Sequence, residues 1–284
     1  MTTMMASPTT MSGTGYEAIG AKEFATIQKL MHDHAGIVLK ETKQALVEAR
    51  VNSRLRLLAL SSYTEYVQYL EGAKGEDELV HLIDAITTNV THFFREPDHI
   101  DCLQQEVAGW LEAGKRKFRF WSAGCSTGEE PYSMAMMLRQ VQGIEGADVR
   151  ILATDVSTRV LKKAMAGRYR LSKVEAVPEQ YRRGAFSPDG GTHAVITEAL
   201  KRNILFRRLN LNATPYPIEG MFDAIFCRNV MIYFDRELRA RIINEAHRLL
   251  NPNGLLVVGH AETLLGVDSK FGFLQPSVYR KVNA

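Results

Sequence analysis

The alternation of short apolar runs with helical stretches, from about residue 118 onward, constrains the fold of this chain more than any other feature. The runs are FRFWSAG, DVRILATD, FDAIFCRNV and GLLVVGH, and a helical pattern over residues 131–141 follows the first of them. Buried strands of a parallel sheet read as nearly continuous apolar runs, and each needs a crossover, usually a helix, to reach the next strand. We therefore expect an α/β fold in this half, with a parallel sheet covered by helices.

The residues that precede this half show helical periodicity and no strand-like alternation. Phe24, Ile27 and Met31 recur at helical spacing. Helices are expected up to a stop at Gly36, over residues 41–60, after a capping box formed by Ser62 and Glu65, and over residues 76–87. The pattern predicts a small all-α domain.

These differences in hydrophobic pattern along the sequence suggest where the domain boundaries lie. Residues 1–16 are small, polar and glycine-containing, and we expect a disordered tail there. The expected domains are an N-terminal helical domain over 17–88, a linker with a linker helix over 89–115, and an α/β domain over 116–284. Residues 168–208 interrupt the α/β rhythm with two strand-like pieces, Thr192–Thr197 and Asn203–Arg208, which we interpret as an inserted antiparallel β subdomain.

Charge and cysteine content exclude several classes of protein. The 35 Lys and Arg residues nearly balance the 32 Asp and Glu residues, so the net charge of +3 does not indicate a nucleic-acid or membrane surface. The three cysteines form no CxxC, and the histidines form no spacing typical of a metal site. No apolar stretch approaches the roughly 20 residues that span a bilayer. We expect a cytoplasmic monomer without a metal.

The loop WSAGCSTGEEPYS, residues 121–133, carries the sharpest local signal. Small residues at the end of a strand let the backbone approach a ligand at the carboxyl edge of the sheet. The loop contains neither G-x-G-x-x-G nor GK[ST], so a phosphate-binding P-loop is excluded. Glu129 and Glu130 disfavour an anion and favour a cationic ligand, such as the sulfonium and amino group of S-adenosylmethionine. The alternative is a helix N-terminus whose glutamates only complement its dipole.

Asp155 ends the next predicted strand, about thirty residues further on. A carboxylate at that point can accept hydrogen bonds from both ribose hydroxyls of a nucleoside. The alternative is that Asp155 caps the helix that follows. Together with the small-residue loop, Asp155 indicates an adenosine-containing ligand, without separating a methyltransferase from a dehydrogenase.

The motifs TTNVTHFFRE (87–96), WSAGCSTGEEPYS (121–133), ATD (153–155), LNL (209–211) and FDAIFCRNVMIYF (222–234) resemble, in order, those of the CheR family of chemotaxis protein methyltransferases. The resemblance extends over residues 24–281. It implies an enzyme that transfers a methyl group from S-adenosylmethionine to glutamate side chains on the cytoplasmic helices of chemoreceptors. It also implies a Rossmann-like methyltransferase sheet with a small antiparallel β subdomain, preceded by a small all-α domain.

The resemblance also implies roles for individual residues. The cofactor-binding set that it implies is Asn89, Thr91, Arg95, Gly124, Glu130, Asp155, Asn210, Leu211, Arg228 and Asn229. In that set Glu130 would hold the methionine end, Asp155 the ribose, and Asn210 with Leu211 the adenine. Tyr233 would lie near the transferred methyl group, and Arg95 and Tyr233 would be the catalytic pair.

The chemistry needs little beyond alignment of the reactants. A glutamate with a free pKa of about 4.3 is already ionised at neutral pH, so no general base is required. Arg95 could hold the incoming carboxylate and Tyr233 could orient it through its hydroxyl. Taken alone, Arg95 could instead form an interdomain salt bridge, and Tyr233 could pack in an aromatic–aliphatic cluster with Phe226, Ile232 and Phe234.

A local basic stripe suggests where a receptor could dock. Residues 40–56 hold five basic and two acidic side chains, and Lys43, Arg50 and Arg54 share one helical face by their spacing. Chemoreceptor methylation helices are rich in glutamate, so this face is a candidate docking surface. A solvated helix face is the alternative. Two other functions stay open: methylation of another substrate, or a cofactor-binding scaffold without catalysis.

Overall fold

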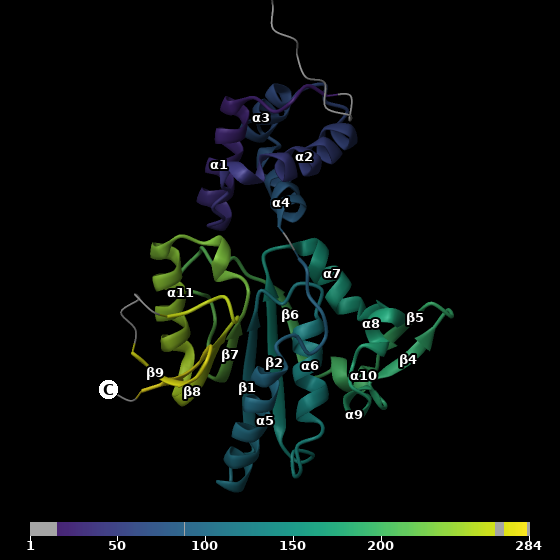
Figure 1. The fold of residues 1–284 in the computed structure, drawn as a ribbon, viewed down its shortest axis with the longest axis vertical. Coiled ribbons are helices and arrows are strands. Elements are labelled where there is room, and N and C mark those ends of the chain that lie inside the picture. The colour runs from purple at the N-terminus through teal and green to yellow at the C-terminus, as the bar shows by residue number, and fades with distance from the viewer. Residues whose placement is uncertain (1–15, 88, 265–269, 283–284) are drawn as a thin grey trace, which may run out of the picture. The chain divides into compact units, whose positions relative to one another are not determined.

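The structure is a computed structural model that describes residues 16–87, 89–264 and 270–282. The chain divides into two compact units, residues 1–88 and residues 89–284 (Figure 1). All but the last residue of the predicted tail, residues 1–16, lies outside the described residues. Within the described ranges, no helix is both long enough and apolar enough to cross a membrane.

In the part of the first unit that the structure describes, residues 16–87, every helix or strand element is a helix or a 3₁₀ turn. Its elements are α1 (Ala21–Ala35), the 3₁₀ turn η1 (Glu41–Lys43), α2 (Gln44–Leu58), α3 (Tyr63–Glu71) and α4 (Gly75–Ile86), which confirms the expected helices. Helix α1 ends where predicted, because Gly36 adopts the left-handed conformation with φ 70°. The Ser62 hydroxyl accepts a hydrogen bond from the Glu65 amide at 3.2 Å, as the capping-box pattern predicts.

A buried ion pair joins α2 to α4 within this unit. Arg54 donates two hydrogen bonds to Glu78, at 2.8 and 2.6 Å, and the two side chains are 14% and 3% exposed. The prediction that Arg54 belongs to an exposed basic stripe is therefore wrong. The helical spacing was right, but α4 covers that end of the face and neutralises the charge. Lys43 and Arg50 are exposed.

The second unit is built on a seven-stranded sheet of order β6-β2-β1-β7-β8-β10-β9. Its strands are β1 (Lys117–Ala123), β2 (Asp148–Asp155), β6 (Ile204–Arg208), β7 (Phe222–Cys227), β8 (Leu250–Val258), β9 (Phe271–Gln275) and β10 (Val278–Lys281). The first five in this list pair in parallel, and β10 is antiparallel to both β8 and β9. The apolar runs of the sequence are thus the inner strands, as predicted.

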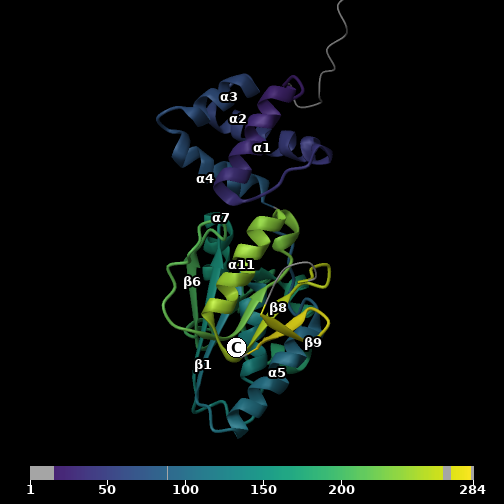
Figure 2. The same cartoon turned by 90° about the vertical axis from the view of Figure 1, so that its left-hand side faces the viewer.

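Helices cover both faces of this sheet. Phe118 and Phe120 of β1 join a core cluster with residues of α5 (Pro97–Glu112) and α6 (Glu129–Leu138). Trp121, which points to the opposite face because strand side chains alternate, packs against Tyr216 and Phe222. Helix α11 (Arg236–Leu249) packs along β8 (Figure 2). Every residue of β7 is buried, as expected for an inner parallel strand.

The insertion forms a separate three-stranded antiparallel sheet of order β3-β5-β4. Its strands are β3 (Arg168–Arg170), β4 (Phe186–Asp189) and β5 (His193–Ile196), with the short helices α8 (Leu171–Glu175), α9 (Glu179–Arg182) and α10 (Glu198–Lys201). The assignment of Asn203–Arg208 to this subdomain is wrong, because Ile204–Arg208 is β6 and pairs in parallel with β2. As an edge strand, β6 is only partly buried, so its sequence looks like an exposed hairpin strand.

Candidate cofactor and methyl-transfer site

The strand order fixes where a ligand can bind. From β1 the chain builds the sheet outward through β2 and β6, and later on the opposite side of β1 through β7 and β8. In open α/β sheets the crevice at such a reversal, at the carboxyl ends of the strands, is the usual binding site. The residues predicted to bind the cofactor follow or end β1, β2, β6 and β7, or lie in the segment that precedes α5.

The loop between β1 and α6 has a backbone that requires glycine. Gly124 has φ 81°, and its N–H donates to the Thr154 carbonyl at the end of β2, at 2.8 Å. A Cβ at Gly124 would lie 2.4 Å from Cγ2 of Val230. The loop therefore stays close to both β2 and the segment after β7.

Asp155 holds this loop in place. Its two carboxylate oxygens accept hydrogen bonds from the N–H groups of Ser126 and Ser157, each at 2.9 Å, and the residue is 8% exposed. Helix α7 (Thr158–Ala166) is capped by Ser157, whose hydroxyl accepts from the Val160 amide at 3.3 Å. The N-cap of α7 is therefore Ser157 rather than Asp155, whose carboxylate binds the amide of that N-cap residue. Its carboxylate lies at the sheet edge, beside the loop.

The two adjacent glutamates of α6 face different partners. Glu129 is fully buried and accepts hydrogen bonds from Thr127, at 2.6 Å, and from Lys173 of α8, at 2.5 Å. Glu130 accepts from the Ser122 hydroxyl at 2.6 Å and lies 3.4 Å from the guanidinium of Arg228. Burial raises the pKa of Glu130, and the nearby Arg228 opposes that shift. Glu130, rather than Glu129, thus belongs to the Arg228 network.

Arg228 links the end of β7 to the segment before α5. It lies 3.2 Å from Oε2 of Glu96, and it donates to the backbone oxygen of Arg95. The Asn229 amide also donates to Glu96, at 3.2 Å. Burial opposes ionisation of Glu96, but Arg228, Asn229 and His260 together outweigh it, so the pKa of Glu96 is lowered. Glu96 ends the motif TTNVTHFFRE, and no sequence pattern singled it out as a site residue.

Arg95 itself is half-buried and has local partners. Its guanidinium donates to the Val90 carbonyl at 3.2 Å and lies 3.9 Å from Glu96. Asn89 lies in the same segment, and its carbonyl accepts from the Ser126 hydroxyl at 3.2 Å. Thr91 lies between them and is half-buried. This segment therefore contacts the loop after β1 on one side and the loop after β7 on the other.

Asn210 and Leu211 follow β6 and lie near Asp155. The Leu209 N–H donates to the Asp155 carbonyl at 3.1 Å, which brings this turn to the end of β2. Leu211 is buried, and its carbonyl accepts from the Tyr216 hydroxyl at 3.0 Å. The structure thus gathers all the predicted cofactor residues around one sheet edge. Lys43, Arg50 and Arg54 belong to the other unit.

Tyr233 ends the 3₁₀ turn η2 (Met231–Tyr233), and Glu262, which the sequence analysis missed, holds that turn. The buried Glu262 carboxylate accepts from the N–H groups of Asn229, Gly259 and Ile232, at 2.7, 2.6 and 3.2 Å. Tyr233 is half-buried. The cluster that was its packing alternative is only partly present, because Ile232 is exposed. The acid in GHAET, just after a predicted strand, was the available signal for Glu262.

Replacing Glu262 with glutamine should lower turnover more than it weakens cofactor binding. The amide keeps an oxygen acceptor but places an N–H donor against a backbone N–H, so the loop that carries Asn229 and Tyr233 loses a fixed position. We expect a turnover loss of about tenfold, which corresponds to about 1.4 kcal/mol. Steady-state kinetics together with calorimetry would check this, and equal losses in both quantities would contradict a role in positioning this loop.

Comparison with known proteins agrees with this architecture. Residues 89–280 match the profile of the CheR methyltransferase SAM-binding domain, and residues 22–87 match that of the CheR methyltransferase all-alpha domain. The fold and the site define an S-adenosylmethionine-dependent methyltransferase with a Rossmann-like sheet. More particularly, the chain belongs to the CheR methyltransferase family.

Curated relatives match nearly end to end. The chain is 36% identical to the chemotaxis protein methyltransferase of Borreliella burgdorferi, over 91% of this chain and 94% of the relative. It is 38% identical to chemotaxis protein methyltransferase 2 of Pseudomonas aeruginosa, over 91% and 92%. It is 37% identical to the chemotaxis protein methyltransferase of Escherichia coli, over 92% and 91%. The family resemblance inferred from the sequence motifs is confirmed.

Proposed function

We propose that this protein transfers a methyl group from S-adenosylmethionine to glutamate side chains of chemoreceptors, giving glutamate methyl esters. The observation that carries the proposal is that a member of the CheR methyltransferase family gathers, at one sheet edge, residues of the motifs that resemble those of that family. The glutamate substrate and the receptor partner are carried over from the family resemblance.

The residues at the sheet edge fit S-adenosylmethionine. The close loop at Gly124 offers backbone rather than side chains, and a Cβ there would meet Val230. Asp155 offers a carboxylate to the ribose hydroxyls, and Glu130 offers negative charge to the amino and sulfonium groups. Asn210 and Leu211 would flank the adenine, and Asn89, Thr91, Arg228 and Asn229 would complete the pocket. When bound, this cofactor supplies a methyl group on a positively charged sulfur.

The protein's own residues then have to align the acceptor. A glutamate carboxylate is ionised at neutral pH, since its free pKa is about 4.3, and it needs no general base. Arg95, partly exposed and anchored by the Val90 carbonyl, would hold that carboxylate through charge-assisted hydrogen bonds. Tyr233 would orient it through its hydroxyl. Most of the rate enhancement would come from fixing the two reactants in line.

Replacing Tyr233 with phenylalanine should separate alignment from packing. The ring remains and only the hydroxyl is lost, so turnover on receptor should fall about tenfold while cofactor affinity stays within about twofold. Replacing Arg95 with alanine should lower turnover at least as much. Single-turnover kinetics would check both variants. Full turnover in the phenylalanine variant would leave Tyr233 with a packing role only.

Only two of the three basic residues predicted to dock the receptor remain candidates in the structure. Lys43 and Arg50 are exposed, whereas Arg54 is held by Glu78. We propose that Lys43 and Arg50, the docking pair, attract the acidic receptor helix. Reversing both charges should raise the receptor KM roughly fivefold, since each exposed charge pair contributes up to about 1 kcal/mol. Cofactor affinity should not change, because the docking pair lies in the other unit.

Salt provides the check on this docking prediction. Raising the ionic strength from about 0.05 to about 0.5 M shortens the Debye length from about 14 to about 4 Å. Receptor methylation by the wild type should weaken, and the Lys43→Glu, Arg50→Glu variant should respond less. If methylation by the wild type does not depend on salt, or if the variant has a normal receptor KM, this face is only a solvated helix face and does not dock the receptor.

Labelled S-adenosylmethionine distinguishes the three candidate functions. The protein is incubated with receptor-containing membranes, RNA and a small-molecule extract. Base-labile label on the receptor supports the proposal, whereas label on RNA or a metabolite indicates another substrate. Cofactor binding in calorimetry without any transfer would indicate a scaffold that has lost its chemistry.

A further inference from the structure

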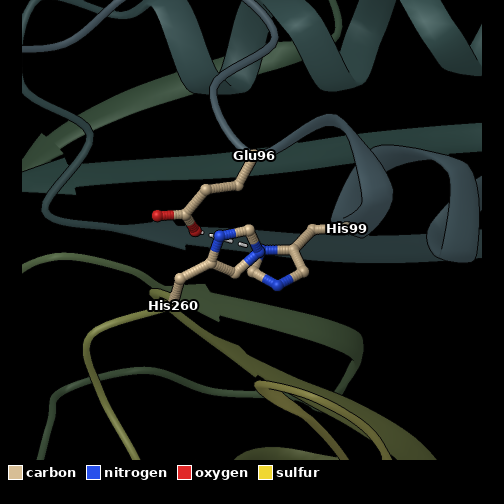
Figure 3. A group of neighbouring side chains, drawn as sticks. All are labelled: Glu96, His99 and His260. Carbon is tan, nitrogen blue, oxygen red and sulfur yellow. Dashed lines mark ion pairs between the residues drawn. The ribbon is translucent and has the colours of Figure 1, made fainter.

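We propose that Glu96, His99 and His260 form a binding site for a divalent transition metal ion such as Zn²⁺. Glu96 directly precedes α5, His99 lies in its first turn, and His260 follows β8. The structure brings one ligand atom of each within 4.8 Å of the others. Figure 3 shows the three side chains pointing toward one another from these segments. Their separation in the sequence hides this group from any search for metal-ligand spacing.

The strongest indication of a ligand is that the His99 ring is buried without hydrogen bonds. Its side chain is fully buried, and among the described residues neither ring nitrogen has a hydrogen-bond partner. Nδ1 lies 3.3 Å from Oε2 of Glu96. Buried polar atoms are nearly always satisfied, so a group left without hydrogen bonds calls for an explanation. A metal ion bound through Nδ1 would supply a partner for that nitrogen, and Nε2 lies 3.7 Å from Oδ2 of Asp98.

His260 already has the outer partner that metal-bound histidines commonly use. Its Nε2 lies 3.0 Å from Oδ2 of Asp98, which leaves its other nitrogen for a metal. A carboxylate on the distal nitrogen fixes the ring and increases its basicity toward a metal. The rings of His260 and His99 lie edge to face, with centroids 4.8 Å apart. His260 is 52% exposed, so the site has an open route to solvent.

The charges near the cluster are compatible with a cation. Glu96 and Asp98 contribute two carboxylates, and Arg228 and Arg95 approach Glu96. Glu130, which also faces Arg228, brings a third carboxylate to the same network. A carboxylate oxygen has two lone pairs, so Oε2 of Glu96 can accept from Arg228 and also bind a metal. Ligating carboxylates are commonly held by hydrogen bonds of this kind.

The ligand set selects the class of metal. Two imidazoles and one carboxylate suit zinc and its neighbours cobalt and nickel rather than magnesium or calcium, which prefer all-oxygen ligands. With bonds of about 2.0–2.1 Å, a tetrahedral ion holds its ligand atoms about 3.3 Å apart, which is the distance between Nδ1 of His99 and Oε2 of Glu96. His260 would have to reach a similar spacing by a small movement of its half-exposed side chain together with Asp98. The fourth position would hold water.

Direct metal binding by the full-length protein tests the proposal, independently of methyl transfer. The protein is prepared without a histidine tag, treated with a chelator, and titrated with Co²⁺ and with Zn²⁺ against a fluorescent chelator. We expect one ion per chain, with a visible Co²⁺ absorption typical of tetrahedral coordination. Affinity should fall at least tenfold in His260→Ala, because losing one ligand costs at least as much as losing an outer partner.

The controls keep the result interpretable. His81 is exposed on α4 and outside the cluster, so His81→Ala should bind the metal like the wild type. His260→Ala changes an exposed side chain and should fold normally. His99→Ala removes a buried ring, and it serves as a second variant that should also lose metal affinity. Zn²⁺ should raise the melting temperature of the wild type but not of His260→Ala. Absence of saturable binding by the wild type, or equal binding by His260→Ala, would overturn the proposal.

Discussion

Replacing Glu78 with alanine should lower the free energy of unfolding of the helical unit by about 3–5 kcal/mol, because it leaves Arg54 buried without its counter-ion. The pair is bidentate, and Glu78 also accepts a hydrogen bond from the buried Tyr66 hydroxyl at 2.8 Å. Both partners of Glu78 would lose their acceptor together. Amide hydrogen exchange in α2 and α4 would measure the loss within this unit of the full-length protein.

A matched substitution on the same helix separates this effect from a general change in α4. Glu76 lies two positions before Glu78 in the first turn and is exposed. Its replacement with alanine removes the same charge near the helix N-terminus, which is worth only about 0.3–1 kcal/mol. Equal destabilisation by the two substitutions would show that the buried ion pair contributes nothing particular.

Replacing Asp155 with alanine should weaken binding of S-adenosylmethionine and of its demethylated product by about 1.5–3 kcal/mol, or roughly ten- to 150-fold. The change removes the carboxylate proposed for the ribose, and it also removes the acceptor that holds the N–H of Ser126. Asp155→Asn, which keeps one oxygen acceptor, should lose less. Calorimetry would measure both variants.

The control for Asp155 lies at the opposite end of the same strand. Asp148 begins β2, is exposed, and pairs with Arg119 at the amino edge of the sheet. Asp148→Ala should leave cofactor affinity unchanged. Unchanged affinity in a folded Asp155→Ala protein would remove Asp155 from the site.

The inner strands and the helices of the first unit could be predicted because local pattern determined them. Each of β1, β2, β7 and β8 contains a short, largely apolar run, and α1 ends at a glycine. Strand β6 was misplaced because an edge strand is buried on one side only, and nothing in its own sequence says which sheet it joins. Arg54 was misplaced for a related reason: helical spacing gives a face, but not the helix that covers it.

The site residues fall into two similar groups: those that local sequence indicates, and those whose partners are distant in the sequence. Local sequence indicated Glu130 and Asp155 as candidates, since Glu130 lies at the start of the helix after the small-residue loop and Asp155 ends a strand. Glu262 and Lys173 act through partners far away in the sequence, the amides of Asn229 and Ile232 in one case and Glu129 in the other. Such partners become visible only once the fold has brought the segments together.

Mass spectrometry of a receptor after incubation with this protein and S-adenosylmethionine tests the central claim most directly. The account predicts that receptor peptides gain one methyl group on a glutamate side chain, and that mild base removes it as methanol. The gain should depend on Arg95 and Tyr233. A stable methyl group on lysine, arginine or an N-terminus, or transfer only to a non-receptor substrate, would contradict a protein-glutamate methyltransferase.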